Sequence, residues 1–442
     1  MASLRFPPGP KARFPGDLFI RFRRDPLNFL IASASQYGDI VGFRFGSQPF
    51  VFVNHPDAIR DVLVTHQKNF TKGRVLERAR VFLGNGLLTN EGESRLRQRR
   101  LAQPAFHRER IATYAAAMVE YTARVRDRWH DTIELDVHEA MMALTLAIVG
   151  KTLFDADVEH EASEIGQALS DVFDTFNLSM MPFSEILRKL PLPAIRKGNR
   201  GRKRLDETVF RIIAERRANS VDRGDLLSML LLATDEDGTS MSDQQLRDEA
   251  MTLFIAGHET TANLLTWAWY VLARNHGAEA KLHAEVDALG HEPSFADLPK
   301  LEYTRRVVAE TMRLYPPAYA IGRRAIEEYQ LGDYALPART IVLASQYTQH
   351  RDARWFPDPE RFDPDRWSAD EVAKRPKFSY FPFGAGTRIC IGEQFAWTEA
   401  VLVLATLAQR WRLWLAPKQR IALQPRITLR PKYGMRMIAT RR

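Results

Sequence analysis

The only cysteine of the chain, Cys390, lies in a glycine-rich loop that reads FGAGTRICIG from Phe383 to Gly392. A helix is predicted to begin just after this cysteine, and the free N–H groups and positive dipole end of a helix favour a thiolate over a thiol. The glycines let the backbone turn tightly against a flat group, and Arg388 offers a cation to a carboxylate of the same ligand. An iron porphyrin requires this combination of an axial thiolate, a shielding aromatic ring, space and a cation for a propionate.

Other uses of this loop fit less well. A dinucleotide-binding loop would need a third glycine where Ile389 stands, and it should follow a strand. A cysteine nucleophile needs a paired histidine, and no histidine lies nearby in the sequence. A single cysteine also excludes an intramolecular disulfide and metal sites built from several thiolates.

The loop matches in full the pattern F-G-x-G-x-R-x-C-x-G, and the sequence resembles the cytochrome P450 superfamily of heme-thiolate monooxygenases, of the soluble bacterial type. The resemblance covers nearly the whole chain. It implies a mainly α fold with a smaller β lobe, a long central helix that crosses the distal heme face, and heme b (iron protoporphyrin IX) bound through Cys390. The other cofactor-binding residues that the resemblance implies in this loop and helix are Phe383, Gly384, Gly386, Arg388, Gly392 and Ala256.

A second motif, AGHETT at residues 256–261, lies in the middle of the predicted long helix. It matches the [A/G]-G-x-[D/E]-T-[T/S] pattern of the superfamily. The match implies two catalytic residues: Thr260 borders the oxygen pocket and Glu259 helps to relay protons for O–O cleavage. The pair His258–Glu259 also begins the zinc-protease pattern H-E-x-x-H, but Ala262 stands where the second histidine is needed, which argues against zinc.

Glu310 and Arg313 lie three residues apart and face each other on a predicted helix. Their place between the apolar helix and the heme loop matches the superfamily. By resemblance, Arg361 supplies a second arginine and closes an ion-pair triad whose role is structural. Loss of Arg313 is expected to release the heme, because breaking a buried charge network costs roughly 3–5 kcal/mol.

Arginines are the expected partners of the heme propionates. Residues 95–100, RLRQRR, are expected to lie on a basic helix. In the superfamily this helix often reads W-x-x-x-[R/H], and here Arg99 fits the second position while Arg95 replaces the tryptophan. Arg99 is therefore the better candidate, and the role of Arg95 stays open. Arg323, in the strand after the Pro316–Pro317 pair, is a third candidate.

Electrons are expected from a separate protein, because the chain holds no flavin-binding stretch and no cysteine set. A ferredoxin or flavodoxin with its reductase is the expected donor, and O2 and a lipophilic small molecule are the expected substrates. No nucleic-acid partner is expected. Several basic residues are candidates for a docking face toward an acidic electron donor: Arg97, Arg100, Lys374, Arg375 and Lys377.

The composition is that of an ordinary globular protein, with 45% hydrophobic and 26% charged residues. A net charge of +9 fits an acidic partner or an anionic surface as well as an evenly basic surface without a partner. The longest apolar stretches, residues 141–149 and 400–408, fall short of the roughly 20 residues that a bilayer requires. With no signal-like N-terminus, a cytoplasmic protein without a stable membrane anchor is expected.

Apolar periodicity predicts the elements that must position these motifs. Helices are predicted over 110–129, 139–154, 161–176, 202–217, 226–233, 243–275 and 391–411, and strands over 40–45, 49–53, 324–326, 329–331 and 340–343. We expect one domain over residues 1–442, with β-rich parts at about 35–60 and 320–345 and helical parts at about 94–320 and 391–411. Helix 243–275 is apolar nearly all round, so its Gly257 indicates a functional bulge, a close ligand or tight packing. The basic run 188–204 is interpreted as a solvated loop, with lipid or anionic-substrate contact as the minor alternative.

The resemblance implies insertion of one oxygen atom from O2 into a lipophilic molecule, by hydroxylation or epoxidation. By resemblance, the expected pocket walls are mostly apolar and aromatic. They are a loop over residues 75–88, the segments 173–186 and 319–321, and the long helix near Phe254 and Ala256. Two alternatives stay open: a peroxide-driven or isomerising heme-thiolate enzyme, and a heme sensor without catalysis. Substrate identity, regiochemistry, the specific redox partner and oligomeric state do not follow from the sequence.

Overall fold

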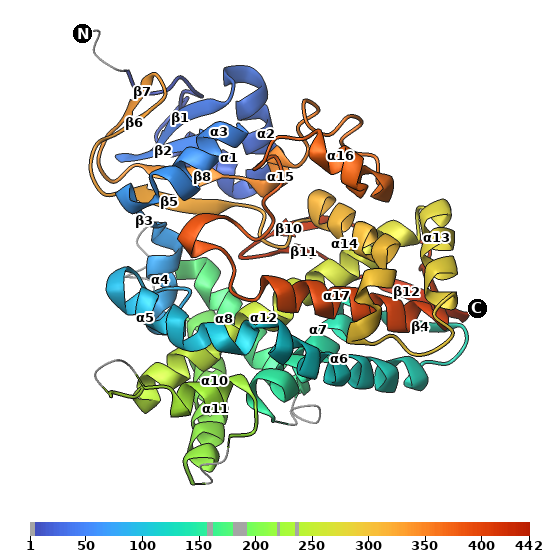
Figure 1. The fold of residues 1–442 in the computed structure, drawn as a ribbon. Coiled ribbons are helices and arrows are strands. Elements are labelled where there is room, and N and C mark those ends of the chain that lie inside the picture. Colours follow the sequence, from blue (N-terminus) through green and yellow to red (C-terminus); the bar gives the residue numbers. More distant parts are fainter. Residues whose placement is uncertain (1–4, 157–161, 180–191, 219–221, 235–237) are drawn as a thin grey trace. The chain divides into compact units, whose positions relative to one another are not determined.

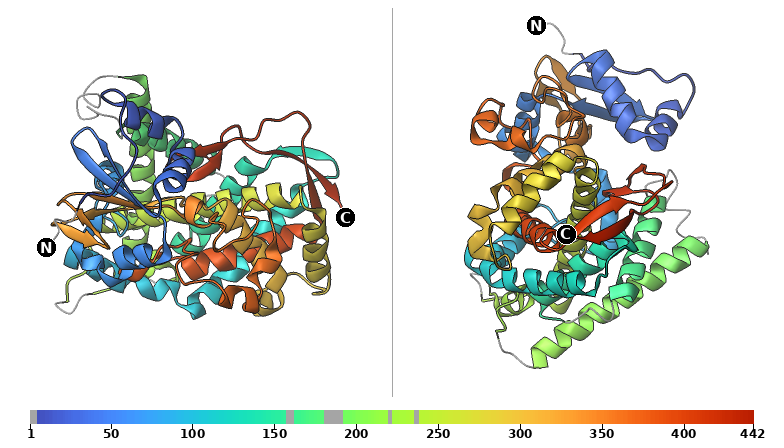
Figure 2. Two further views of the ribbon diagram at one scale, coloured as in Figure 1. Left: turned by 90° about the horizontal axis from the view of Figure 1, so that it is seen from above. Right: turned by 90° about the vertical axis from the view of Figure 1, so that its right-hand side faces the viewer.

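The computed structural model describes residues 5–156, 162–179, 192–218, 222–234 and 238–442 (Figures 1 and 2). Contacts divide the chain into two compact units, each assembled from two separate stretches of sequence. Unit 1 contains Met1–Glu77 and Ala309–Cys390, and unit 2 contains Arg78–Val308 and Ile391–Arg442. The assignment of the whole chain to a single domain stays a prediction.

Unit 1 is built on a five-stranded mixed sheet in the order β1-β2-β8-β5-β3. Its strands are β1 (Ile40–Phe45), β2 (Gln48–Val53), β3 (Phe70–Lys72), β5 (Ile321–Ala325) and β8 (Ile341–Ala344). The β1–β2 hairpin is antiparallel, β2 pairs in parallel with β8, and β5 lies antiparallel between β8 and β3. The sheet therefore joins strands from the start of the chain to strands from its last third, which are blue and orange in Figure 1.

Short elements complete unit 1. They are α1 (Asp17–Arg24), α2 (Pro26–Tyr37), α3 (Pro56–Arg60), the π-helical turn η1 (Asp61–Thr65), η2 (Gln67–Asn69), β6 (Tyr329–Leu331), β7 (Tyr334–Leu336), α15 (Gln346–Gln349), η5 (Pro364–Trp367), α16 (Ala369–Ala373) and η6 (Gly386–Arg388). A core cluster that includes Val51, Leu63, Phe70 and Phe381 packs the sheet against the segment that leads to the cysteine loop. Burial of apolar side chains is thus what positions this loop within unit 1.

Unit 2 is predominantly helical. Its helices are α5 (Gly92–Ala102), η3 (Gln103–Phe106), α6 (Arg108–Arg128), α7 (Val137–Phe154), α8 (Ala162–Ser179), α10 (Pro193–Ala218), α11 (Leu226–Leu232), α12 (Asp243–Leu272), α13 (His276–Asp287), η4 (Phe295–Lys300) and α17 (Glu393–Ala408). Helices α4 (Arg74–Leu83) and α14 (Glu302–Leu314) include residues of both units. A three-stranded sheet has β12 (Arg436–Arg441) between β4 (Ile133–Asp136) and β9 (Trp411–Leu415), and β10 (Leu423–Pro425) and β11 (Leu429–Pro431) form a hairpin.

The predicted long helix is confirmed as α12, which runs for 30 residues. It begins with a capping box in which Ser242 and Gln245 exchange hydrogen bonds between side chain and backbone. Its side chains are buried on nearly every face, as the all-round apolar pattern predicted. A Cβ on Gly257 would lie 3.0 Å from Cγ2 of Val149 on α7, so tight helix packing explains this glycine.

Helix α7 packs along α12 and is itself strongly apolar. It has 18 residues and a mean hydropathy of 1.3, so by length and composition alone it meets the requirement for a membrane span. The apolar stretch 141–149 noted in the sequence is therefore only the centre of a longer helix. Because 67% of this helix is buried inside the protein, its apolar side chains belong to the core of unit 2.

The prediction of a loop over the basic run 188–204 is wrong for residues 193–204, which belong to helix α10. Residues 188–191 lie outside the described residues. The loop was inferred from the basic residues, but residues 193–204 are helical, and the glycines among them, Gly198 and Gly201, let α10 approach α8 closely. A Cβ on Gly201 would lie 2.6 Å from the carbonyl oxygen of Ala168. Most of the lysines and arginines of this run remain exposed, so the outer face of α10 is basic and solvated.

Candidate functional site

The loop that carries Cys390 is closed by a backbone hydrogen bond of 3.0 Å from Cys390 N to Phe383 O. Gly384 and Gly386 turn the loop with φ values of +75° and +71°, a region that residues with a Cβ rarely adopt. A Cβ on Gly386 would also lie 2.1 Å from the carbonyl oxygen of Leu63. Both conformation and space therefore require this glycine, and the resulting turn leaves the cysteine side chain exposed.

Arg388 fastens the loop to the segment that precedes β3. Its guanidinium donates hydrogen bonds to the carbonyl oxygens of Gln67 at 3.1 Å and Phe70 at 2.8 Å. The backbone N–H and the hydroxyl of Thr387 both donate to Gln67 Oε1 at 2.8 Å. Arg388 thus holds the shape of the loop within unit 1, whereas its contact with a propionate stays a prediction.

The helix that follows the cysteine begins at Glu393, with Gly392 at its N-cap. Cys390 precedes the first helical residue by three positions, so the predicted place of the thiol just ahead of a helix N-terminus is confirmed in the chain order. Gly392 has an ordinary φ of −88°, and a Cβ there would meet Phe106 at 3.7 Å, a normal contact distance. The backbone therefore requires a glycine at 386 but not at 392, where only a bound ligand would supply a reason.

An exposed strip interrupts the buried surface of α12 at its centre. Ala256 is exposed and Gly257 and Thr260 are half-buried, while the residues on either side of them are buried. Positions 256 and 260 share one face of the helix, and Thr260 Oγ1 donates to the carbonyl oxygen of Ala256 at 2.8 Å. The small side chain of exposed Ala256 leaves room for a flat ligand on this face, whereas Gly257 packs against Val149 of α7.

Glu259 lies on a different side of α12 from this strip and is 2% exposed. Its Oε1 accepts hydrogen bonds from Thr428 Oγ1 at 2.6 Å and from Arg430 Nη2 at 2.8 Å. Both partners belong to the β10–β11 hairpin near the C-terminus. The predicted acid and alcohol, Glu259 and Thr260, are thus neighbours in sequence that face different surroundings.

His258 has a packing role. It is fully buried, its Nδ1 lies 2.9 Å from the carbonyl oxygen of Phe254, and its own carbonyl oxygen accepts a hydrogen bond of 3.0 Å from Thr145 on α7. Burial lowers the pKa of His258, so its imidazole is neutral at pH 7.

The predicted pair Glu310–Arg313 is fully buried, with both side chains 0% exposed. Two hydrogen bonds of 2.8 and 2.9 Å join the guanidinium to the two carboxylate oxygens. The expectation that Arg361 completes the triad is wrong, because Arg361 is exposed and presents its carbonyl oxygen, not its side chain, to Arg313. Arg366 approaches Glu310 at 3.5 Å instead, and the indole N–H of Trp367 donates to it at 3.0 Å.

The candidate propionate arginines are largely buried. On α5, Arg95 is 4% exposed and Arg99 is half-buried, and the two lie one turn apart on the same face. Arg323, in β5, is 5% exposed and donates to the carbonyl oxygen of Gly322 at 3.0 Å. Arg95 replaces the tryptophan of the superfamily pattern. Because its side chain is buried on the same face as that of Arg99, Arg95 stays a candidate.

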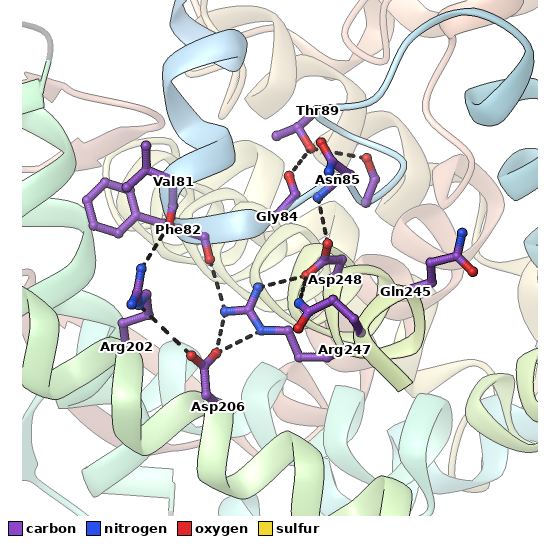
Figure 3. Close-up of polar contacts among 12 residues, drawn as sticks. Val81, Phe82, Gly84, Asn85, Thr89, Arg202, Asp206, Gln245, Arg247 and Asp248 are labelled. Atoms are coloured by element: carbon purple, nitrogen blue, oxygen red, sulfur yellow. Dashed lines mark hydrogen bonds and ion pairs between the residues drawn. The ribbon is translucent and has the colours of Figure 1, made fainter. Parts of the chain in front are cut away.

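The loop predicted as a pocket wall over residues 75–88 is wrong up to Leu83, because these residues belong to helix α4; only the turn that follows is irregular, and it is fastened to α12 (Figure 3). The backbone N–H of Asn85 donates to Asp248 Oδ2 at 2.7 Å. Gly84 has a φ of +66°, and a Cβ there would lie 2.1 Å from the same carboxylate. One further turn residue is held in the same way, since Leu87 N donates to the carboxylate of Glu249 at 2.9 Å.

Arg247 extends this anchor to a third helix. It donates to the carbonyl oxygen of Phe82 at 3.1 Å and forms an ion pair with Asp248 at 3.0 Å. It also pairs with Asp206 of α10, so one buried guanidinium joins α4, α10 and α12 (Figure 3).

Phe254, which was expected to line the pocket, faces away from the exposed strip of α12. The ring of Phe254 lies 5.7 Å from that of Phe154, so it faces α7 and not the exposed strip at Ala256. Residues 180–186 lie outside the described residues, and of Phe173 and Phe176 only the backbone is described.

Arg375 does not present a free charge to a docking partner. Its guanidinium lies 4.5 Å from the ring centroid of Trp367 and 4.8 Å from that of Phe356, and burial lowers its pKa. Lys374 is exposed but forms an ion pair with Glu371 at 2.5 Å.

Sequence reasoning missed the residues that surround Glu259. Thr428 and Arg430 contact it from a hairpin far along the chain, and no local pattern marks them. Asn263, one turn after Glu259 on α12, and His138, at the start of α7, extend the same network. Only Asn263 had a signal in the sequence, because a polar residue four positions after Glu259 lies on the same side of the helix.

Each unit, taken by itself, holds residues of the kind that bind a heme held by a thiolate. In unit 1 an exposed cysteine stands in a loop whose shape is fixed by two left-handed glycines, and in unit 2 the exposed face of α12 offers the small side chain of Ala256 and the hydroxyl of Thr260. Buried arginines on α5 and β5 supply cations of the kind that carboxylate side groups need.

Comparisons with known proteins agree with this chemistry. The family model described as Cytochrome P450 matches residues 7–436. The chain is 43% identical over 411 residues to cyclooctatin synthase of Streptomyces melanosporofaciens, which covers 92% of this chain and 89% of the relative. It is 40% identical to cyclooctat-9-en-7-ol 5-monooxygenase of the same organism, with 89% and 86% covered. It is 37% identical to pentalenene oxygenase of Streptomyces avermitilis, with 89% and 88% covered.

Solved structures show the same fold. Retinoic acid bound cyanobacterial CYP120A1 superposes with a TM-score of 0.89 at 25% identity and covers 100% of both chains. The heme domain of cytochrome P450DA superposes with a TM-score of 0.89 at 26% identity and covers 99% of this chain and 98% of that one.

Proposed function

Because the chain belongs to the cytochrome P450 family, we propose that it is a monooxygenase of terpene hydrocarbons or terpene alcohols. The reaction inserts one oxygen atom from O2 into a lipophilic molecule and uses electrons from a separate redox partner. Two relatives named for oxidising cyclooctat-9-en-7-ol and pentalenene support the choice of substrate class. Hydroxylation of a ring carbon is the oxidation that we expect.

The cofactor implied by the family is a heme bound by a cysteine thiolate, and we propose heme b with Cys390 as its axial ligand. The heme, when bound, supplies the activation of O2. The observation that carries this proposal is the exposed thiol in a loop closed by the Cys390 N to Phe383 O bond, just ahead of α17. The contacts proposed for the ring and its propionates come from Phe383, Gly384, Gly386, Arg388, Gly392, Ala256, Arg99 and Arg323.

Two residues of α12 are proposed to handle protons. The hydroxyl of Thr260 lies on the exposed strip beside Ala256, where it can donate to or accept from a bound ligand. Glu259 is the acid that resupplies this hydroxyl, and general acid catalysis of this type typically contributes about 100-fold or more to a rate.

We propose a ferredoxin or flavodoxin as the electron donor, in a cytoplasmic setting. On α5, Arg97 is half-buried and Arg100 is exposed on a helix with several other cations. Acidic redox proteins associate with such surfaces by charge steering, so the rate of reduction should fall steeply as salt rises. A rate independent of salt would remove this choice of partner face.

The carbon monoxide difference spectrum of the reduced protein tests the proposed heme ligand. The wild type should show the red-shifted band of a thiolate-ligated heme, and Cys390→Ala should lose it. A panel with pentalenene, other terpenes and long-chain fatty acids then tests the substrate class through the spectral change that follows displacement of the sixth ligand. Binding of fatty acids but of no terpene would overturn the terpene proposal.

A further inference from the structure

The carboxylate of Glu259 is held by the C-terminal hairpin and not by groups of its own helix. The hydrogen bonds of 2.6 Å from Thr428 and 2.8 Å from Arg430 both end on the same oxygen, Oε1. Thr428 lies in the turn just before β11 and is 5% exposed, and the side chain of Arg430, within β11, is 14% exposed. A charge-assisted pair with so little exposure holds a side chain more firmly than a surface ion pair does.

Two further polar residues extend this contact in one direction. Thr428 Oγ1 accepts a hydrogen bond of 3.3 Å from Asn263 Nδ2, and Asn263 Oδ1 lies 3.2 Å from His138 Nε2. Because an amide oxygen can only accept, His138 carries its proton on Nε2 in this arrangement. Each group therefore donates to the next in the order His138, Asn263, Thr428, Glu259. A side-chain amide is a poor proton carrier, so we assign the chain to orienting Glu259.

The titratable groups near Glu259 come from three elements, β11, α7 and α12. Arg430 contributes a cation from β11. His138 on α7 is neutral at pH 7, because burial and then the charge of Arg430 lower its pKa, while Asp136 opposes this effect. On α12, burial lowers the pKa of His258. At neutral pH the arginine is therefore the charged partner of the acid.

We propose that Arg430 and Thr428 are positioning residues that hold Glu259 on the hairpin side of α12 and thereby control its supply of protons to Thr260. This inference rests on the proposed roles of Glu259 and Thr260. Since Thr260 lies on the exposed strip and Glu259 faces the hairpin, the carboxyl group must rotate between the two to deliver a proton. The side chain of Arg430 is partly exposed, so Glu259 lies near solvent when it contacts the hairpin. In that position the carboxyl group takes up a proton from solvent to replace the one it delivered.

Five single variants, Glu259→Gln among them, and one double variant test the proposal in the heme-loaded protein. Arg430→Met removes the charge, Arg430→Lys retains it, and Thr428→Val removes the hydroxyl with little change of shape. Arg436→Met is the matched control, because Arg436 pairs with Glu134 on the exposed side of β12 in the same C-terminal region. The double variant combines Glu259→Gln with Arg430→Met in a thermal-unfolding cycle, which needs neither substrate nor redox partner.

Turnover is measured with pentalenene as the probe and a ferredoxin and reductase as electron donors. Arg430→Met should lower product per NADPH by about tenfold, raise released peroxide and increase the solvent isotope effect, because proton delivery becomes limiting. Thr428→Val should change the same quantities to a smaller extent, Arg430→Lys should restore most of the coupling, and Arg436→Met should resemble the wild type. In the thermal cycle, the double variant should lose less stability than the sum of the single variants.

Either of two results overturns the proposal: strictly additive losses in the thermal cycle, or an unchanged peroxide fraction and isotope effect in both heme-loaded Arg430→Met and Thr428→Val. A wild type without the thiolate band in its carbon monoxide spectrum would instead overturn the proposed heme function. The thermal cycle would still report on the Glu259–Arg430 contact in that event.

Discussion

Buried ionisable side chains of this protein differ in whether an opposite charge accompanies them. Glu310 meets Arg313 in two hydrogen bonds, and Glu259 meets Arg430 in one. Glu399 on α17 is fully buried among apolar residues, and burial raises its pKa to about 8, an effect that the nearby hydroxyl of Thr261 only partly offsets. Glu399 is therefore protonated at pH 7, which makes it sensitive to alkaline conditions.

The first prediction concerns the Glu310–Arg313 pair. Arg313→Ala should destabilise the protein by about 3–5 kcal/mol and reduce its heme content. The buried Glu310 would lose its close cation and keep the more distant Arg366, at 3.5 Å. Urea unfolding and the carbon monoxide spectrum measure these two quantities. Arg361→Ala is the control and should change stability by less than about 0.5 kcal/mol, since its side chain is exposed. Equal losses in both variants would contradict the assignment of Arg366 as the second arginine.

The second prediction concerns pH. The pKa of Glu399 rises from its ordinary 4.5 to about 8 on folding, so the folded state retains a proton that the unfolded state loses between these values. The stability from this group is complete below pH 4.5 and falls as the pH rises toward 8, by at most about 1.4 kcal/mol per pH unit.

Glu399→Gln removes this dependence. The melting temperature of the variant relative to the wild type should therefore rise between pH 5 and pH 8 and then level off. Glu120→Gln, at an exposed position, should give a curve parallel to the wild type. A Glu399→Gln curve that is also parallel would mean that this carboxyl group is not buried in its neutral form.

Short motifs identified Cys390, Glu259 and Thr260 as candidate site residues, because the spacing that marks each of them is local. The contacts that complete the site are not local: Arg430 reaches Glu259 from 171 residues away in sequence. Arg361 was predicted in place of Arg366 because a sequence match gives the position of a residue but not whether its side chain or its carbonyl oxygen faces the partner.

Among the elements, helix boundaries were predictable where capping residues mark them. The start of α12 at Asp243 agrees with the predicted helix 243–275 and is capped by Ser242, whereas α10 begins at Pro193, nine residues before the predicted helix 202–217, because the basic run was interpreted as a loop. The glycines of this run are required by a neighbouring helix, which the sequence around them does not show. The α8–α10 contact is therefore a tertiary feature that reverses a local preference.

A third prediction tests this contact. Gly201→Ala should destabilise the protein by about 1–3 kcal/mol, because the new Cβ would meet a backbone oxygen at 2.6 Å that cannot move aside. Gly277→Ala, near the start of α13, is the matched control, since a Cβ there meets no atom within 4 Å. The control should be neutral or up to about 1 kcal/mol more stable in urea unfolding. A stabilising Gly201→Ala would show that the two helices do not approach so closely.

A fourth prediction concerns the turn after α4. Asp248→Ala should cost about 1–3 kcal/mol and speed hydrogen exchange at residues 84–89, because the N–H of Asn85 and one arm of Arg247 lose their acceptor. Arg202→Ala is the control, because this half-exposed arginine donates to the carbonyl oxygen of Val81 from the solvent side (Figure 3). Exchange rates that stay unchanged in Asp248→Ala would mean that the turn is held by other contacts.

At the scale of the whole molecule, neither compact unit is continuous in sequence. The chain leaves unit 1 after Glu77, returns at Ala309 and leaves again after Cys390. Unit 2 closes only with the last strands, because β12 lies between β4 and β9 and places Met437 and Ala439 in the core. Such an arrangement could not be predicted from apolar periodicity, which identifies strands but not their partners.

The fifth prediction follows from this closure. Removal of residues 423–442 takes away the hairpin and β12, and with them the fully buried Leu429, Met435 and Met437. At about 1.5–3 kcal/mol for each large apolar side chain, the loss approaches the total stability of a typical protein, roughly 5–15 kcal/mol. The truncated chain should show no cooperative melting by circular dichroism and should elute in aggregates. Cooperative melting of a monomeric truncated chain would contradict the closing role of β12.

The place of Thr428 and Arg430 near the C-terminus has a consequence during translation. A nascent chain has both signature motifs, at residues 256–261 and 383–392, well before these two residues leave the ribosome. Until then Glu259 has neither of its hairpin partners, so a prematurely stopped product would retain both motifs and lack the strands that complete the core of unit 2. Premature termination late in the gene should therefore prevent folding even though both motifs are intact.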